Sequence, residues 1–202
     1  MSRPSRPASD AAAPPRIIGG ELRGRRLEFV PHERTRPMKD RVRETLFDLL
    51  GPTVRGTLVL DLFAGSGALG FEALSRGAAR VVFVERHFPT ADALGRSARG
   101  LGVTDRVEVR PGDAFAWARR LAELPTGSPW LAFIAPPWPL LQERAADVVA
   151  LVAALDEAAP PGTTLVVESD VAFDPAALPD PGGWEHRAIP PAVLHLHGGL
   201  VS

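Results

Sequence analysis

DLFAGSGALG, residues 61–70, is the stretch of sequence that decides the fold. It follows an apolar run at 57–62 and opens a helical pattern at 68–76. Its glycines form a G-x-G-x-x-G pattern, which lets the backbone approach a ligand at the carboxyl end of a strand. The pattern also fits a nicotinamide dinucleotide enzyme, or a tight turn that binds nothing. Its place between a strand and a helix favours ligand binding over an empty turn.

Apolar runs alternate with helical segments from residue 56 onward, and a hairpin around Pro190-Pro191 is expected to close the chain. This alternation is typical of a mostly parallel sheet covered on both faces. The sequence therefore predicts an α/β fold with a doubly wound, Rossmann-like sheet. The expected strands are 57–62, 80–84, 107–110, 130–134, 163–167, 184–189 and 193–197, and the expected helices are 68–76, 89–101, 114–124 and 142–155.

The chain before this domain divides into two regions. Residues 1–15, rich in Ser, Pro, Ala and Arg, are predicted to be a disordered tail because they have few apolar groups to offset the entropy of ordering. Residues 16–52 are predicted to form an extension of a β-hairpin and a helix, and residues 53–202 the main domain. In the extension we expect strands at 17–18 and 27–30, then a helix from Met38 to Gly51, with its charged residues mainly on the outer faces: Lys39, Arg41, Arg43 and Glu44.

Charge is distributed unevenly along the chain. The net charge is −1, yet residues 1–43 hold eleven basic and five acidic residues, so they carry +6 and the remaining residues carry −7. A basic arm on an acidic body indicates a polyanionic partner that meets one face of the protein. A solvated charged end that maintains solubility is an equally good interpretation of the charge alone.

Several classes of protein are excluded or disfavoured by the sequence. The chain has no cysteine, which excludes disulfides, thiolate metal sites and cysteine nucleophiles. It has no apolar stretch near the roughly 18 residues of a membrane span, and no secretory signal pattern, so we expect a cytoplasmic protein. His195 and His197 alternate in a predicted strand, but no third ligand is evident, so we expect no metal.

Acidic residues stand at the ends of three successive predicted strands: Asp61, Glu85 and Asp113. A doubly wound sheet brings these ends to one crevice. Glu85 is placed to accept the ribose hydroxyls of an adenosine, or is a solvated acid at a strand end. Asp113 is placed to receive an adenine amino group, to cap the following helix, or to do both.

A proline motif, Ala135-Pro136-Pro137-Trp138-Pro139, follows the fourth strand. The two prolines fix the backbone of this turn, and the carbonyl of Pro136 has no local amide competing for it. Trp138 offers a flat face on which a base could stack, or is a core aromatic beside a proline loop. Because the motif lies at the same sheet edge as the glycine loop, the sequence favours a place in the binding site.

From Arg16 to about Glu168 the chain resembles the bacterial 16S ribosomal RNA guanine-N2 methyltransferases. The resemblance rests on RIIGG at 16–20 with RGR at 23–25, on TRP at 35–37 with DRVRE at 40–44, on the glycine loop continuing through FEALSRGA at 71–78, and on Glu85. It implies a class I methyltransferase fold with a seven-stranded sheet whose last strand is reversed. It favours a methyltransferase over an NAD-dependent oxidoreductase.

The resemblance also implies a cofactor, a partner and a set of site residues. S-adenosylmethionine is the implied cofactor, and the implied substrate is the exocyclic N2 of a guanine in small-subunit ribosomal RNA or in the assembling 30S subunit, bound by a monomer. The residues implied to hold the cofactor are Asp61, Phe63, Ala64, Gly65, Ser66, Gly67, Glu85 and Asp113. Those implied to receive the base and its amine are Ala135, Pro136, Pro137 and Trp138. Those implied to grip RNA phosphates are Arg16, Arg23, Arg25, Arg34, Arg36 and Arg41.

The chain departs from this family chiefly at position 135. Family members carry Asp or Asn before the two prolines and usually Tyr after them, whereas this chain has Ala135 and Trp138. Trp138 can still stack on a base, but Ala135 has no side-chain acceptor. A catalytically impaired homologue that binds RNA or cofactor is therefore the alternative, and Ala135→Asp is predicted to raise turnover. A lesser departure is Met38, where the family commonly has Thr.

Overall fold

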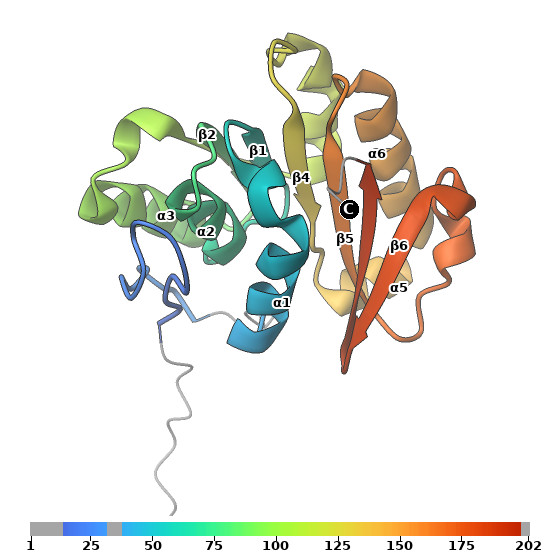
Figure 1. Ribbon diagram of the computed structural model, residues 1–202, viewed down its shortest axis with the longest axis horizontal. Coiled ribbons are helices and arrows are strands. Elements are labelled where there is room, and N and C mark those ends of the chain that lie inside the picture. Colours follow the sequence, from blue (N-terminus) through green and yellow to red (C-terminus); the bar gives the residue numbers. More distant parts are fainter. Residues whose placement is uncertain (1–13, 32–37, 199–202) are drawn as a thin grey trace, which may run out of the picture.

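The protein is built on one seven-stranded sheet with the strand order β3-β2-β1-β4-β5-β7-β6 (Figure 1). The computed structural model describes residues 14–31 and 38–198. Strands β1 to β5 run parallel, β7 is antiparallel to β5, and β6 is antiparallel to β7. The strands are β1 (Leu58–Asp61), β2 (Arg80–Glu85), β3 (Val107–Pro111), β4 (Trp130–Ile134), β5 (Thr164–Asp170), β6 (Trp184–Ile189) and β7 (Ala192–Gly198). This confirms the predicted Rossmann-like α/β fold.

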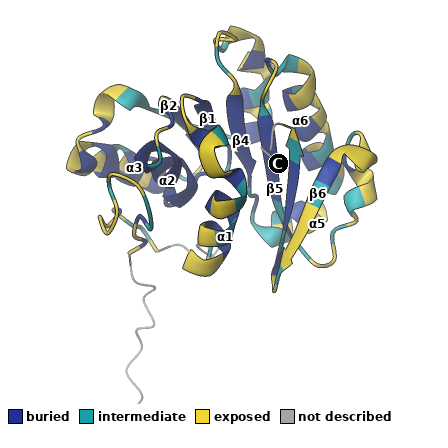
Figure 2. Cartoon of the chain, viewed as in Figure 1, coloured by how far each residue is buried: buried dark blue, intermediate teal, exposed yellow. Residues whose placement is uncertain are grey.

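Helices cover both faces of the sheet (Figures 1 and 2). The sheet therefore lies between two hydrophobic cores, one on each face. One core packs α1 (Asp40–Leu50), α2 (Ala68–Ser75) and α3 (Phe88–Leu101) on the sheet. The other packs α4 (Ala114–Trp117) and α6 (Ala145–Ala158) on the opposite face, with Leu141 of α5 (Trp138–Glu143). Strand order reverses between β1 and β4, and ligands of doubly wound sheets bind at such a switch point, beyond the carboxyl ends of the strands.

Two predicted helices differ from the observed ones. The helix expected at 114–124 is one turn of α4 followed by a 3-10 helix (Ala118–Glu123), which tightens before Pro125. The helix expected at 142–155 is α6, preceded by the short α5, and the two are broken at Arg144, where φ is −130°. α5 starts at Trp138 because Pro139 suits a first helical turn.

The N-terminal extension forms less β structure than expected. Its hairpin is reduced to one antiparallel bridge between Arg16 and Arg26, and no strand forms at 27–30. The two segments of the arm share only a few backbone hydrogen bonds, from the N–H groups of Ile17, Gly24 and Leu27, and other backbone donors of the arm bond side chains on helices. The N–H groups of Ile18 and Gly19 donate to the Glu72 carboxylate at 2.7 and 2.8 Å, and further donors from the arm go to serines of α2 and α3.

Helix α1 confirms the predicted helix, but one of its charges is on the wrong face. Arg43, expected outside, is 1% exposed. Its Nη2 donates to the Arg16 carbonyl at 2.7 Å and to Asp40 at 3.0 Å. Arg43 is buried because it fastens the arm to α1. The tail at 1–13 and the loop at 32–37 lie outside the described residues, and the division into 1–15, 16–52 and 53–202 stays a prediction.

Candidate functional site

The glycine loop begins at Asp61, the last residue of β1, whose side chain is buried beneath it. Asp61 Oδ2 accepts the N–H of Gly70 at 3.1 Å, which ties the strand end to the first turn of α2. Burial raises the pKa of Asp61 to about 7, the hydrogen bond from Gly70 opposes this rise, and the charge of Glu85 adds to it. The observed partner of Asp61 is therefore the loop itself, and a direct contact with a cofactor stays a prediction.

The three glycines of the loop have separable roles. Gly65 and Gly67 have φ values of 49° and 73°, in the left-handed region that favours glycine, and so allow the sharp turn into α2. A Cβ on Gly70 would lie 2.3 Å from the Phe83 ring, so this glycine lets α2 pack closely on β2. The turn, which also contains Phe63, Ala64 and Ser66, sits at the carboxyl edge of the sheet as the sequence predicts.

Glu85 joins the end of β2 to the glycine loop. Its Oε2 accepts the N–H of Gly65 at 2.8 Å, and its Oε1 accepts the N–H of His87 at 2.8 Å. Each carboxylate oxygen has a second lone pair, so both can still accept hydrogen bonds from hydroxyl groups of a ligand. The carboxylate is thus held in place before any ligand binds.

Asp113, after β3, caps helix α4. Its Oδ1 accepts the N–H groups of Phe115 and Ala116 at 3.0 and 3.1 Å. This confirms the capping interpretation, and Oδ2 is left as the atom for an amino group. Asp61, Glu85 and Asp113 therefore stand at the ends of three adjacent strands, as the sequence predicts.

An aromatic pair beside these acids was not anticipated from the sequence. The rings of Phe63 and Phe115 meet edge to face with centroids 5.7 Å apart. The guanidinium of Arg144 lies 4.1 Å from the centroid of the Phe115 ring. The pair links the glycine loop to α4 and to the break between α5 and α6. The sequence feature that could have indicated this pair is Phe115, two residues after the helix cap Asp113, where a solvated helix would carry a polar residue.

The proline motif leaves β4 next to the glycine loop. Pro137 is the N-terminal cap of α5, and its carbonyl accepts the N–H of Leu141 at 3.0 Å. The Pro136 carbonyl accepts no hydrogen bond from the described part of the chain. Ala135 and Trp138 are partly buried and pack on the core that α1 and α2 share. The motif therefore offers one open carbonyl and one partly covered indole ring.

Glu168 is the acidic residue at this edge that sequence reasoning did not assign to the site. It lies in β5, one residue past the Val167 that pairs with Ile134 of β4. It is partly buried, and burial raises its pKa to about 7. The sequence feature that could have identified Glu168 is its position directly after the strand-forming run 164–167, because Asp61 and Glu85 were identified as acids at the ends of such runs.

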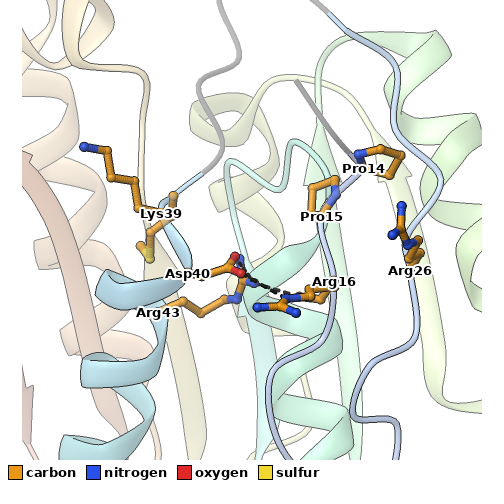
Figure 3. Close-up of a pocket in the computed structure, with 8 residues that line it drawn as sticks. Pro14, Pro15, Arg16, Arg26, Lys39, Asp40 and Arg43 are labelled. Atoms are coloured by element: carbon orange, nitrogen blue, oxygen red, sulfur yellow. Dashed lines mark hydrogen bonds and ion pairs between the residues drawn. The ribbon is translucent and has the colours of Figure 1, made fainter. Parts of the chain in front are cut away.

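A basic pocket of about 360 Å³ lies between the arm and the N-terminus of α1 (Figure 3). Arg16 and Arg26 enter it from the arm, and Lys39 and Arg43 from the start of α1. Asp40 bonds Arg16 Nε at 3.2 Å and Arg43 Nη2 at 3.0 Å. Asp40 thus pairs with two of the four cations, next to the positive end of a helix dipole, and Lys39 extends away from it (Figure 3).

The predicted RNA-binding arginines are not all brought together. Arg16 lines the pocket, whereas Arg23 is exposed on the turn of the arm and Arg25 donates to the carbonyl of Gly100. Arg41 is exposed on α1. Arg34 and Arg36 lie outside the described residues. The pocket also contains three basic residues that the sequence did not assign to RNA binding: Arg26, Lys39 and Arg43.

The described helices include none that is both long and apolar enough to cross a membrane. The same residues contain no cluster of three or more His, Asp or Glu side chains that could bind a metal ion. His195 is instead buried, with its Nε2 2.8 Å from Ser169 Oγ and its Nδ1 2.8 Å from Nδ1 of His186.

Comparison with known proteins matches nearly the whole chain to one family model, described as Conserved hypothetical protein 95, over residues 15–186. The chain is 39% identical over 123 residues to a Bacillus subtilis protein provisionally named rRNA methyltransferase YlbH, a match that covers 61% of this chain and 66% of that protein. It is 56% identical over 70 residues to "Ribosomal RNA small subunit methyltransferase D" of Escherichia coli K12, covering 35% of each. These matches thus span about two thirds and one third of the two relatives.

Solved structures match over a longer stretch. A provisionally assigned methyltransferase of Escherichia coli, yhhF, superposes with a TM-score of 0.71 and 30% identity, covering 94% of this chain and 99% of that one. An RNA methyltransferase of Salinibacter ruber, solved in complex with S-adenosyl-L-homocysteine, has a TM-score of 0.58 at 20% identity, covering 83% and 95%. The second likeness concerns the fold alone.

Proposed function

Because the chain belongs to the Conserved hypothetical protein 95 family, among relatives named as ribosomal RNA methyltransferases, we propose that it methylates the exocyclic N2 amine of a guanine in small-subunit ribosomal RNA with S-adenosylmethionine as methyl donor. The observation that carries the proposal is the shared sheet edge. A glycine turn, the held carboxylates of Glu85 and Asp113, and a proline motif with an open carbonyl all leave adjacent strands there.

The residues present fit S-adenosylmethionine by the chemistry of their donors and acceptors. Glu85 has lone pairs for the ribose hydroxyls, and Asp113 Oδ2 has them for the adenine amino group. The glycine turn allows close approach of the backbone, and Phe63 adds apolar surface beside it. The buried Asp61, whose pKa is raised to about 7, supports the turn from below.

When bound, S-adenosylmethionine would supply a methyl group on a sulfonium: the amine nitrogen would bond to the methyl carbon as the carbon–sulfur bond breaks, that bond's electron pair would stay on sulfur, and one N–H proton would pass to solvent. The chain's own residues position the amine. The Pro136 carbonyl accepts one of its N–H groups, and Trp138 stacks on the base, an interaction worth about 1 to 3 kcal/mol.

We assign the basic pocket to an RNA phosphate. Arg16, Arg26 and Lys39 provide exposed cations around one opening, and planar guanidinium groups match phosphate oxygens. The buried Arg43 completes the wall and fixes the arm in place. Binding there would hold the RNA backbone while the target base enters the site at the sheet edge, in the way that enzymes acting on a base take it out of its stack.

The deciding experiment is methyl transfer to isolated small ribosomal subunits. Purified protein, S-adenosylmethionine with a tritiated methyl group, and subunits from a strain lacking the corresponding methylation are combined, and labelled nucleosides are separated after digestion. We expect N2-methylguanosine as the labelled product. Label in another nucleoside, or none, contradicts the proposal.

A catalytically impaired homologue is the second candidate, and Ala135 is the observation that favours it. Methyl transfer separates these two candidates, and calorimetric titration separates both from an oxidoreductase. Both predict binding of S-adenosylhomocysteine and of small-subunit RNA, but only the active enzyme transfers label. Tight binding of a nicotinamide dinucleotide without binding of S-adenosylhomocysteine would instead support an oxidoreductase.

A further inference from the structure

We propose that the Glu168 carboxylate provides the hydrogen-bond acceptor that Ala135 lacks, and that it holds the substrate amine together with the Pro136 carbonyl. This inference rests on the proposed methylation of an exocyclic amine. It makes Glu168 a substrate-binding residue contributed by a neighbouring strand, so that the active site is complete without an acidic residue before the two prolines.

The strand register places Glu168 beside Ala135. β4 and β5 are parallel, and their last paired residues are Ile134 and Val167. Ala135 directly follows β4 and Glu168 is the next residue of β5, so continuing the same register sets the two side by side. Neighbouring strands lie about 4.8 Å apart, a gap that the longer Glu side chain can bridge.

Side-chain alternation places the two residues on the same face of the sheet. Phe133 and Val166 pair with one another, and both belong to the core beneath α1. Residues two further along each strand point to the same face, because side chains alternate with a period of two. Ala135 packs against that core, as the alternation requires, and Glu168 follows the same rule.

Glu168 has no protein partner in the described part of the chain, where it makes neither a hydrogen bond nor an ion pair. Glu72 shows the contrast: it is fully buried, but its oxygens accept two backbone N–H groups and pair with Arg76 at 2.8 Å. The pKa of Glu168 is raised by burial alone, with no charge contributing. The Glu168 oxygens are not among the fully buried atoms, so solvent can reach them, but no donor from the described residues meets them, and a donor from the substrate can.

The chemistry of the site then specifies the substrate group. An exocyclic amine has two N–H donors, and the site offers two acceptors: the Pro136 carbonyl and the Glu168 carboxylate. When Glu168 is ionised it only accepts hydrogen bonds, so a carbonyl oxygen in the same place would be repelled; because burial raises its pKa to about 7, this selection holds above that pH. The pair therefore selects a base that presents an amino group at this point.

The test compares four proteins in single-turnover methyl transfer to small subunits: wild type, Glu168→Gln, Ala135→Asp and the double variant. We expect Glu168→Gln to lower the rate by about 10- to 100-fold, by loose analogy with loss of one oriented hydrogen-bonding group in a catalytic site. Ala135→Asp alone should change it by less than about 3-fold, since an acceptor is already present, which replaces the expectation from the sequence. The double variant should recover at least about 5-fold over Glu168→Gln, because the acceptor returns on β4.

Glu108→Gln is the matched control, because Glu108 is a strand glutamate at the far edge of the sheet, paired with Arg80 at 2.7 Å. It should keep the wild-type rate, and all variants should bind S-adenosylhomocysteine with unchanged affinity. A loss below 5-fold in Glu168→Gln, or a double variant no faster than Glu168→Gln, overturns the inference.

A measurement without substrate or cofactor separates this inference from the proposed function. Thermal unfolding at pH 8 should show Glu168→Gln melting above wild type, because the variant removes a partly buried charge that has no partner among the described residues. A lower melting temperature would reveal a structural partner for Glu168 and overturn the inference. Absence of methyl transfer by the wild-type protein would overturn the proposed function, whatever the unfolding result.

Discussion

The two halves of the sheet's carboxyl edge hold their carboxylates differently. At the ends of β1, β2 and β3, Asp61, Glu85 and Asp113 all accept backbone N–H groups from the turns at this edge. At the end of β4 and along β5, Ala135 has no side-chain acceptor and Glu168 has no donor in the described residues. The carboxylates of the first half are thus held before a ligand binds, as is Asp170 at the end of β5, which accepts the N–H of Ala172 at 3.0 Å, whereas the proposed ligand would complete the contacts of Glu168.

This difference has a physical cost on one side only. Hydrogen bonds from backbone N–H groups offset the free energy that desolvating a carboxylate costs, and a carboxylate without a donor lacks this compensation. The hydrogen bond from Gly65 that orients the Glu85 carboxylate for the proposed cofactor also stabilises the glycine turn. Glu168 contributes nothing comparable to folding, which is the pattern of a group retained for function at the expense of stability.

The largest effect expected from this comparison is on stability. The folded-state pKa of Glu168 is raised from 4.5 to about 7, so the folded protein binds more protons than the unfolded chain between these values. Stability from this group is therefore complete below pH 4.5 and is lost as the pH rises through 7. Glu168→Gln should match wild type at pH 4.5 and exceed it at pH 8 by up to about 3 kcal/mol.

Urea unfolding of both proteins at several pH values measures this difference directly. Asp61, with a raised pKa, and His195, whose pKa burial and the neighbouring His186 lower to about 4, also make stability depend on pH. Their contributions are the same in both proteins and cancel in the comparison. A gap that does not widen between pH 4.5 and 8 would mean that Glu168 is paired after all.

A smaller effect is expected on cofactor affinity, and it should appear only in the first half. Glu85→Gln removes one of two charged acceptors that meet Gly65, His87 and the proposed ribose hydroxyls. We expect S-adenosylhomocysteine to bind about 10- to 100-fold more weakly, since a hydrogen bond to a charged group contributes about 1.5 to 3 kcal/mol.

Calorimetry on Glu85→Gln and Glu168→Gln side by side makes this a comparison of the two halves. Only the first variant should lose affinity for the nucleoside, and RNA binding measured by filter retention should stay unchanged in it. Equal losses in the two variants would show that the halves are not separate, and an unchanged Glu85→Gln would remove Glu85 from the cofactor site.

The first half was also the easier one to predict from the sequence. A glycine turn after an apolar strand has few physical solutions, so its position, and the acids that meet there, followed from strand and helix periodicity alone. Glu168 did not, because its role depends on which strand lies beside β4, and that pairing is formed by chain segments about 30 residues apart. Register between distant strands is a tertiary property that no local pattern contains.

The prediction for the N-terminal arm was wrong for a related reason. Its apolar pairs predicted a hairpin, but the backbone donors of Ile18 and Gly19 found the carboxylate of Glu72 on α2. Arg43 was assigned to the surface because charged residues seldom lie in a core, yet the arm's carbonyl at Arg16 and the Asp40 carboxylate give it partners there. In both cases a side chain from a distant segment replaced the expected local partner.

The smallest expected effect concerns the basic pocket, which neither half of the edge contains. Lys39→Gln and Arg26→Gln each remove one exposed cation from its wall. Each should weaken RNA binding by about fivefold at moderate salt and reduce the slope of log affinity against log salt by about 1. Arg119→Gln, an exposed arginine on the 3-10 helix after α4, is the matched control and should leave the slope unchanged. Because the pocket is lined from the arm and from α1, a slope that falls equally in all three variants would mean that RNA senses the overall charge and not this site.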